Sequence, residues 1–572
     1  MSSAKLLFMS SSPQLLTDPF LQLPTETGVR VVWFTEFAGI NHTVIYGEKL
    51  NLTAAANTFK LSRTREDRRS KVRKQTEEKI IYQKPTPRDV WRHEAEINEL
   101  IPGKRVPYLV TSTREDGQTI SSKTFTLTTS PLPETPLKIL LTSDHQLMPM
   151  TAANLQKVVE TIGKLDAVFF AGDLVNIADR ASEWFDDDRG NAFFPCLQGH
   201  ANYELNKNGI KTVYRGGEII QHAPLFTAIG NHEVMGRFSE ESELREQFYN
   251  AFPLAIAKQI YHQNIQDINP DNDLNIKRKW LKDNSFNSDT YEEIFTLPKS
   301  PQGCEKYYAV TLGDLRLVVP YIACVWRTPS LAASANGKYR EREEEFNNLL
   351  SWGYGQHIFE PIKKGSTQYN WLVEELNSAE FTNAKYKIVM FHHPAHTLGE
   401  NIVPAFTDPV RIIDTDYYGF IKSIRYEYPK NLDYIICDVI PLLEDAGVQL
   451  VFYGHSHLWN RFISESGMHF LETSNVGNSY GAFIGDKQRN NIPVGYHEEY
   501  VHTGDPYGLD PVVPNIDPLV DENGELVPYI ASNDFTVFSI LDTGTGTVSS
   551  YRFDTRKPES KVVKFDEFKL KE

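Results

Sequence analysis

The chain has 572 residues, more than one small domain needs. Hydrophobic residues make up 40% and charged residues 23%, a composition that is ordinary for folded globular proteins and excludes wholesale disorder. With 59 Lys and Arg against 75 Asp and Glu, the formal net charge is −16, so the average field repels nucleic-acid backbones and acidic membrane surfaces. We therefore expect neither a nucleic-acid polymer nor a membrane among its partners.

The cysteines and the N-terminus bear on the cellular compartment. The four cysteines are widely spaced and include no C-x-x-C pair, so the sequence predicts neither a zinc knuckle nor a disulfide framework. The first nine residues contain a four-residue apolar run, which is too short for a secretory signal or a membrane span. We expect a cytoplasmic protein, although secretion by another route stays open.

Short β-branched and aromatic runs with turn signals between them fill residues 13–130. They predict an all-β sandwich with strands at residues 29–35, 43–46, 106–110 and 123–128. A charged run at 63–74 interrupts the pattern, and its interleaved acidic and hydroxyl residues favour a solvated loop or edge strand over a nucleic-acid patch. Three prolines within 131–136 predict a stiff linker. We thus expect one domain at 1–130 and another at 131–572.

Beyond the linker, apolar strands alternate with helices, a pattern typical of a layered sheet flanked by helices. Apolar runs predict strands at residues 137–142, 167–171, 224–229, 386–391 and 448–453. Helical spacing predicts helices at 154–163 and 439–446, and the end of the chain predicts a closing hairpin at 534–541 and 547–553. We interpret the long polar segments as insertions over one face, at residues 181–221, 237–300, 327–367, 397–435 and 482–530.

Each of the five predicted strands ends in residues that could bind metal or phosphate. The clusters are Ser143-Asp144-His145-Gln146, Gly172-Asp173, Gly230-Asn231-His232-Glu233, His392-His393-Pro394 and Gly454-His455-Ser456-His457. Any one alone is a weak signal, because a strand-end aspartate or a lone histidine more often forms ordinary hydrogen bonds. Five in chain order predict a shared crevice, since open α/β sheets bind ligands at the carboxyl ends of their strands.

The residue types in these clusters suit a pair of divalent cations. Such a pair needs a carboxylate that bridges both ions and further oxygen and nitrogen donors. We expect Asp173 to bridge, because Gly172 lets the strand end turn sharply. His455 and His457 lie two residues apart, so both rings would project to one side of an extended segment. One ion would be held by Asp173, Asn231, His392 and His455, and the other by Asp144, Asp173 and His457, with Gln146 as a candidate fourth ligand.

These motifs resemble the calcineurin-like metallophosphoesterase superfamily, whose motifs run D-x-H, GD-x-x, GNH[DE], H-x-P and GHxH along the chain. The last four match in residue type and order, over about residues 137–480. With the N-terminal β region, including 24–35, 100–103 and 122–125, the chain more narrowly resembles a purple acid phosphatase. That resemblance implies a fibronectin III-like β-sandwich followed by a four-layer α/β/β/α metallophosphoesterase domain with long loop insertions.

Two positions depart from the family pattern. Purple members place a metal-binding tyrosine three residues after the bridging aspartate, where this chain has Asn176. We therefore expect a colourless centre of two divalent or mixed-valence ions, with Fe, Mn or Zn as candidates. The first motif has Gln146 in place of histidine, which could bind metal through its amide oxygen or hydrogen-bond a bound water.

The resemblance implies hydrolysis at phosphorus by a metal-bound hydroxide. His232 would be the general acid with Glu233 orienting its ring, or else a histidine that only supports a ligand. His393 and His396 would reach the substrate phosphate, or be ordinary loop residues.

We expect a phosphomonoesterase that acts on a small phosphoester, because acidic runs at 183–188 and 341–345 would exclude bulky polyanions. The alternatives are a phosphodiesterase or nucleotide pyrophosphatase, which the Asp144-x-Gln146 motif suggests, and a non-catalytic binding protein with a degenerate site.

Overall fold

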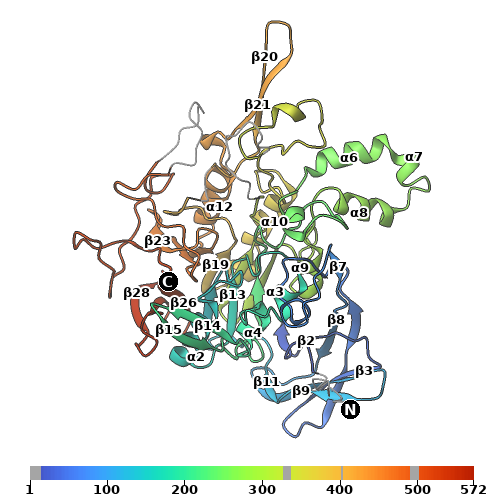
Figure 1. Ribbon diagram of the computed structural model, residues 1–572. Coiled ribbons are helices and arrows are strands. Elements are labelled where there is room, and N and C mark those ends of the chain that lie inside the picture. Colours follow the sequence, from blue (N-terminus) through green and yellow to red (C-terminus); the bar gives the residue numbers. More distant parts are fainter. Residues whose placement is uncertain (1–13, 326–336, 401–403, 490–501, 572) are drawn as a thin grey trace, which may run out of the picture.

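The computed structural model (Figure 1) describes residues 14–325, 337–400, 404–489 and 502–571. The N-terminal segment from which we expected no secretory signal lies outside these residues, as do parts of three predicted insertions. No helix in these four stretches is both long enough and apolar enough to cross a membrane.

Two antiparallel sheets form the N-terminal region. The first has the order β1-β2-β8-β5, with bounds Phe20–Gln22, Val29–Thr35, Trp91–Ile97 and Asn57–Lys60. The second has the order β10-β9-β3-β4, with bounds Thr119–Ser121, Val106–Thr113, Asn41–Tyr46 and Leu52–Ala55, and β11 (Phe125–Leu127) pairs with β9. Alternate side chains of both sheets, among them Trp33 and Tyr108, form one buried core. The predicted all-β region is confirmed.

A pair of stacked histidines is buried in this region. The ring of His93 lies 3.6 Å from that of His42, measured between centroids, and its two nitrogens are hydrogen-bonded to the hydroxyls of Thr35 and Thr58 at 2.8 Å each. Burial, helped by the neighbouring His42 and Arg92, lowers the pKa of His93 to about 3.

Acid should therefore destabilise the folded protein through His93. The unfolded chain binds a proton at this residue below about pH 6.5 while the folded chain does not, so the stabilisation is complete above that pH and is lost as the pH falls. We expect a loss of about 2 kcal/mol by about pH 5. Urea unfolding of the wild type and of His93→Gln, at neutral pH and at about pH 5, measures this loss in the free energy of unfolding. An equal loss in both proteins would contradict the assignment to His93.

The larger region contains two mixed sheets that share one hydrophobic core. The first has the order β16-β13-β12-β26-β27-β28, with bounds Leu225–Thr227, Ala167–Phe170, Lys138–Thr142, Phe535–Asp542, Thr547–Asp554 and Val563–Lys569. The second has the order β17-β18-β19-β22-β24-β23-β25, with bounds Tyr308–Leu312, Leu315–Val319, Tyr386–Met390, Leu450–Tyr453, His469–Thr473, Trp459–Ile463 and Tyr529–Ile530. Strands β12, β13 and β16 run parallel, as do β18, β19, β22 and β24. All five predicted strands are present, and β28 extends the predicted hairpin.

Helices cover these sheets, and insertions extend from them. The two predicted helices are α2 (Thr151–Ile162), which packs on β26, and α12 (Ile440–Asp445), which follows a π-helical turn at Ile435–Val439. A further helix, α10 (Thr367–Leu376), buries Trp371 against Tyr307. In Figure 1 the insertions extend furthest at α6, α7 and α8 (Leu254–Gln263, Ile265–Ile268 and Leu274–Asp283) and at β20 and β21 (Val410–Thr415 and Ile421–Glu427).

The remaining insertion elements are short. They include α3 (Ala181–Phe185), α4 (Phe193–Leu197), β14 (Tyr203–Lys207), β15 (Ile210–Tyr214), α5 (Leu244–Phe248), α9 (Asp289–Ile294) and two 3-10 helices (Glu343–Glu345 and Lys430–Leu432). Of these, α3 and α4 pack together next to the N-terminal region, where Phe34 contacts Phe185 and Phe194.

The charged run at 63–74 joins the two regions. Of the two predicted alternatives, an edge strand is present at Arg65–Glu66, whereas a solvated loop is wrong for residues 63–67, which are buried. Its short strand β6 (Arg65–Glu66) pairs with β7 (Thr86–Pro87). Arg65 donates to Asp179 at 2.7 Å, and Arg63 donates to Asp283 at 2.7 Å. These arginines are buried because carboxylates from distant parts of the chain pair with them, which the local sequence could not reveal.

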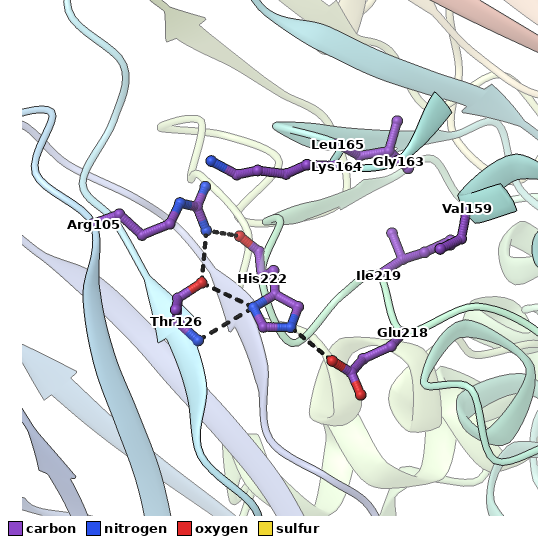
Figure 2. Close-up of a pocket in the computed structure, with 9 residues that line it drawn as sticks. All are labelled: Arg105, Thr126, Val159, Gly163, Lys164, Leu165, Glu218, Ile219 and His222. Atoms are coloured by element: carbon purple, nitrogen blue, oxygen red, sulfur yellow. Dashed lines mark hydrogen bonds and ion pairs between the residues drawn. The ribbon is translucent and has the colours of Figure 1, made fainter. Parts of the chain in front are cut away.

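A second contact between the regions surrounds His222 (Figure 2). Its Nδ1 accepts the backbone N–H of Thr126 at 3.2 Å, and its Nε2 donates to Glu218 at 3.0 Å. Arg105 of the N-terminal region donates to the backbone carbonyl of His222 at 2.8 Å, beside a cavity of about 370 Å³. Polar contacts at two separate places thus hold the N-terminal sandwich against the larger region.

Candidate metal centre

The carboxyl ends of five strands bring the predicted clusters together. Strands β12, β13 and β16 of one sheet and β19 and β22 of the other each end just before one cluster. The Nε2 atom of His392 is the meeting point. It lies 3.1 Å from Oδ1 of Asn231, 3.2 Å from Nδ1 of His455 and 3.3 Å from Oδ2 of Asp173. Four residues from four strand ends therefore surround one buried point.

The second group of predicted ligands lies beside the first. Oδ1 of Asp144 is 3.3 Å from Nε2 of His457, and ligand atoms of Asp144, Asp173 and His392 all lie within 4.8 Å of one another. The amide nitrogen of Gln146 donates to Oδ2 of Asp173 at 2.7 Å. Asn478, which the sequence motifs did not predict, donates to the amide oxygen of Gln146 at 3.3 Å and so fixes that side chain.

The chemistry of this cluster fits metal cations. His392 Nδ1 donates to the carbonyl of Ala171 at 2.8 Å, so a neutral ring would present the Nε2 lone pair to three further lone-pair atoms, as a metal ligand does. Burial opposes protonation of His392, yet Asp173 and Asp144 outweigh it and raise its pKa to about 10. Oδ1 of Asp144 is buried without a hydrogen-bond partner in the described chain. The site thus favours positive charge at its centre.

Several of these side chains are carried on strained backbone. Asp144, Asp173, His455 and His457 have φ values of 56°, 58°, 81° and 58°, in the left-handed region that few non-glycine residues adopt. The predicted extended geometry at His455 and His457 is therefore wrong, because left-handed turns direct the two rings instead. A Cβ at Gly454 would overlap the side-chain oxygens of Ser143 and Asp144, so only glycine permits this approach.

His232 is oriented by the backbone. Its Nδ1 donates to the carbonyl of Asn176 at 2.7 Å, its ring stacks on Phe248 with centroids 4.8 Å apart, and its Nε2 lies 3.9 Å from Oδ2 of Asp173. The prediction that Glu233 orients this ring is wrong. The Glu233 carboxylate accepts the backbone N–H groups of Gly230, Asp173 and Leu174 at 2.7–2.8 Å, so it holds the turn that carries the aspartate.

Asn176 stands where purple members have tyrosine, and here it links two loops. Its side chain donates to the backbone carbonyl of Gln146 at 2.6 Å, and its own N–H donates to Glu183 at 2.7 Å. The two departures from the family pattern, Gln146 and Asn176, are therefore in direct contact.

The two histidines predicted to reach substrate differ in placement. His393 stacks on His455 with centroids 3.9 Å apart, and its Nε2 is 3.1 Å from the sulfur of Cys324. Its Nδ1 is buried without a hydrogen-bond partner in the described chain. His393 could therefore supply a further nitrogen ligand to a metal ion, together with His392 and His455. His396 is buried against Phe470, with Nδ1 2.9 Å from Asp505, and does not support the predicted contact with substrate.

A cleft of about 410 Å³ opens beside the cluster. Gln146, Asn176 and His232 line it on the side of the candidate metal centre, and Tyr480, stacked on His457 at 5.0 Å, lines it as well. A volume of this size suits a small molecule.

A family model for calcineurin-like phosphoesterases matches residues 137–458. The chain belongs to the calcineurin-like phosphoesterase family. The sequence resemblance is confirmed, and this phosphoesterase is an enzyme that hydrolyses phosphoesters. The matched segment contains all five strand-end clusters in full, so its histidine and aspartate cluster could hold the divalent metals that the family uses.

The phosphoesterase is similar to solved structures over nearly its whole length. A purple acid phosphatase from seeds of yellow lupin (Lupinus luteus) is 14% identical, with 96% of this chain and 73% of that one covered at a TM-score of 0.52. A structure of PhoD is 12% identical, covering 98% of this chain and 94% of that one at a TM-score of 0.44. At 14% identity, the likeness to the purple acid phosphatase shows a shared fold and nothing more. No curated protein matches the chain.

Proposed function

We propose that this phosphoesterase hydrolyses small phosphomonoesters at a centre of two divalent or mixed-valence ions of Fe, Mn or Zn. The observation that carries the proposal is the convergence of Asp173, Asn231 and His455 ligand atoms on Nε2 of His392, because a metal cation would satisfy all four at once. One ion would be held by Asp173, Asn231, His392 and His455, and the other by Asp144, Asp173 and His457, with Gln146 fixing the shared carboxylate.

The protein's own residues would carry the other parts of the reaction. Bound cations would supply Lewis-acid charge to the phosphoryl oxygens and lower the pKa of water. His232, held by the Asn176 carbonyl, would donate a proton from Nε2 to the leaving-group oxygen. Glu233 would act as a positioning residue, since its three backbone contacts fix the turn of Asp173.

We also propose the domain limits 1–130 and 131–572. Strand β11 ends at Leu127 and β12 begins at Lys138, and the proline-rich residues 131–136 lie between them. The first domain would be a fibronectin III-like sandwich, and the second a four-layer α/β/β/α domain with its insertions.

Metal analysis combined with a substrate panel tests the proposed function. We expect the purified protein to contain Fe, Mn or Zn, to lose hydrolysis after chelation, and to regain it when one of these metals is added. We expect p-nitrophenyl phosphate to be cleaved faster than bis(p-nitrophenyl) phosphate. Faster cleavage of the diester or of a nucleotide diphosphate derivative would favour the alternative enzymes, and absence of turnover with bound metal would favour a binding protein.

A further inference from the structure

The cleft beside the metal centre is strongly cationic, although the whole chain carries a net charge of −16. Five basic side chains line it against one carboxylate, that of Glu183. They come from two separate parts of the sequence: the predicted sandwich domain contributes two, and the larger domain three. The basic residues are Arg69, Lys71, Arg180, Arg189 and Arg245. Such a concentration of one sign in a concave site attracts anions.

Three of the five basic side chains are already paired with carboxylates. Arg180 is buried between Asp67 and Glu183, Arg189 pairs with Asp187 at 2.8 Å, and Arg69 pairs with Glu243. The acidic run that we expected to repel polyanions is thus largely neutralised where it meets the cleft, because Glu183 and Asp187 face arginines.

Lys71 and Arg245 differ from the other three. Within the described residues neither forms an ion pair with a carboxylate, and both are exposed, as Arg69 and Arg189 also are. Arg245 lies over the ring of Tyr249, 5.7 Å from its centroid, so its guanidinium is directed along an aromatic wall of the cleft. Two cations without a protein counter-charge are therefore free to bind an anion inside the cleft.

We propose that this cleft binds a second phosphate of the substrate, carried on its leaving group, through Lys71 and Arg245. The inference rests on the proposed function, because His232, the proposed proton donor to the leaving group, lines the same cleft. Arginine and lysine are the side chains that recognise phosphate by charge-assisted hydrogen bonds. The rings of Phe248, Tyr249 and Tyr480 offer apolar surface for an organic moiety between the two phosphates. The substrate class is a small organic bisphosphate.

The two regions of the chain would then share in substrate selection. Lys71 belongs to the charged run that docks through Arg63 and Arg65, and its backbone carbonyl accepts the N–H of Asp188 at 2.8 Å. The buried ion pairs of that run thus position an exposed lysine at the cleft.

A ratio of specificities tests the inference. We compare kcat/KM for adenosine 3′,5′-bisphosphate with that for p-nitrophenyl phosphate in the wild type and in the double variant Lys71→Ala/Arg245→Ala. The ratio should fall by about 10- to 100-fold, because two charge-assisted hydrogen bonds to the second phosphate are lost. The matched control, Lys258→Ala/Arg278→Ala, removes the same charge from exposed positions on α6 and α8 and should keep the wild-type ratio.

An unchanged ratio in the double variant would overturn the inference, whether both activities fall together or neither falls. The proposed function has a separate test, since the wild type must hydrolyse p-nitrophenyl phosphate with bound metal. If it does not, calorimetric binding of adenosine 3′,5′-bisphosphate decides the inference alone. Binding at least about tenfold weaker in the double variant than in the control supports it, and equal binding in all three proteins overturns it.

Discussion

Asp173→Asn should leave the protein without most of its metal and almost without activity. The Asp173 carboxylate faces His392 at 3.3 Å through Oδ2, accepts Gln146 there, and accepts the backbone N–H of His232 at 2.9 Å through Oδ1. The asparagine side chain lacks the negative charge of Asp173, and its NH₂ group would face the lone pairs of the neighbouring ligand atoms. Loss of metal stabilisation worth several kcal/mol predicts a fall in kcat/KM of about a thousandfold or more. Elemental analysis and p-nitrophenyl phosphate hydrolysis on one preparation measure both effects.

A matched buried carboxylate separates this effect from general damage to the fold. Asp433 is also buried, and within the described residues it accepts the backbone N–H groups of Phe406, Ile435 and Ile436 and the Tyr507 hydroxyl but hydrogen-bonds none of the proposed ligands. Asp433→Asn should keep its metal while losing stability. If Asp173→Asn retains wild-type metal content, the aspartate is not a ligand, and the proposed ligand sets are wrong.

The position of the site could be predicted because it depends on local patterns and one topological rule. Apolar runs mark the five strands, and parallel strands direct their carboxyl ends to a common edge. Asp173, Asn231 and His392 therefore meet although more than two hundred residues separate the first from the last. Residue type, order and strand ends sufficed for this result.

Contacts between distant parts of the chain could not be predicted in this way. Glu233 adjoins His232 in sequence, yet its carboxylate reaches the N–H groups of Asp173 and Leu174, about sixty positions earlier. The ion pair of Arg65 with Asp179 likewise joins residues that lie far apart in the sequence. The left-handed backbone at His455 and His457 also has only a weak local signal, because histidine adopts this region more often than most non-glycine residues but still rarely.

His232→Ala should slow the cleavage of alkyl phosphates far more than the cleavage of p-nitrophenyl phosphate. The Asn176 carbonyl fixes the Nδ1 proton, and Phe248 fixes the ring plane, so Nε2 is the nitrogen available to the leaving group at the cleft. An alkoxide needs a proton as it departs, whereas p-nitrophenolate is stable without one. General acid catalysis predicts a loss in kcat of about 10²- to 10⁴-fold for the alkyl ester.

The difference between the two esters is the decisive measurement, because a merely structural role for His232 would slow both alike. Phe248→Leu keeps the imidazole but removes the ring on which it stacks, so it should produce a smaller loss with the same leaving-group dependence. His200→Ala, at a partly exposed ion pair with Asp18 outside the cleft, is the histidine control and should leave both rates near the wild type. Equal losses for both esters in His232→Ala would instead assign the ring to binding the phosphoryl group.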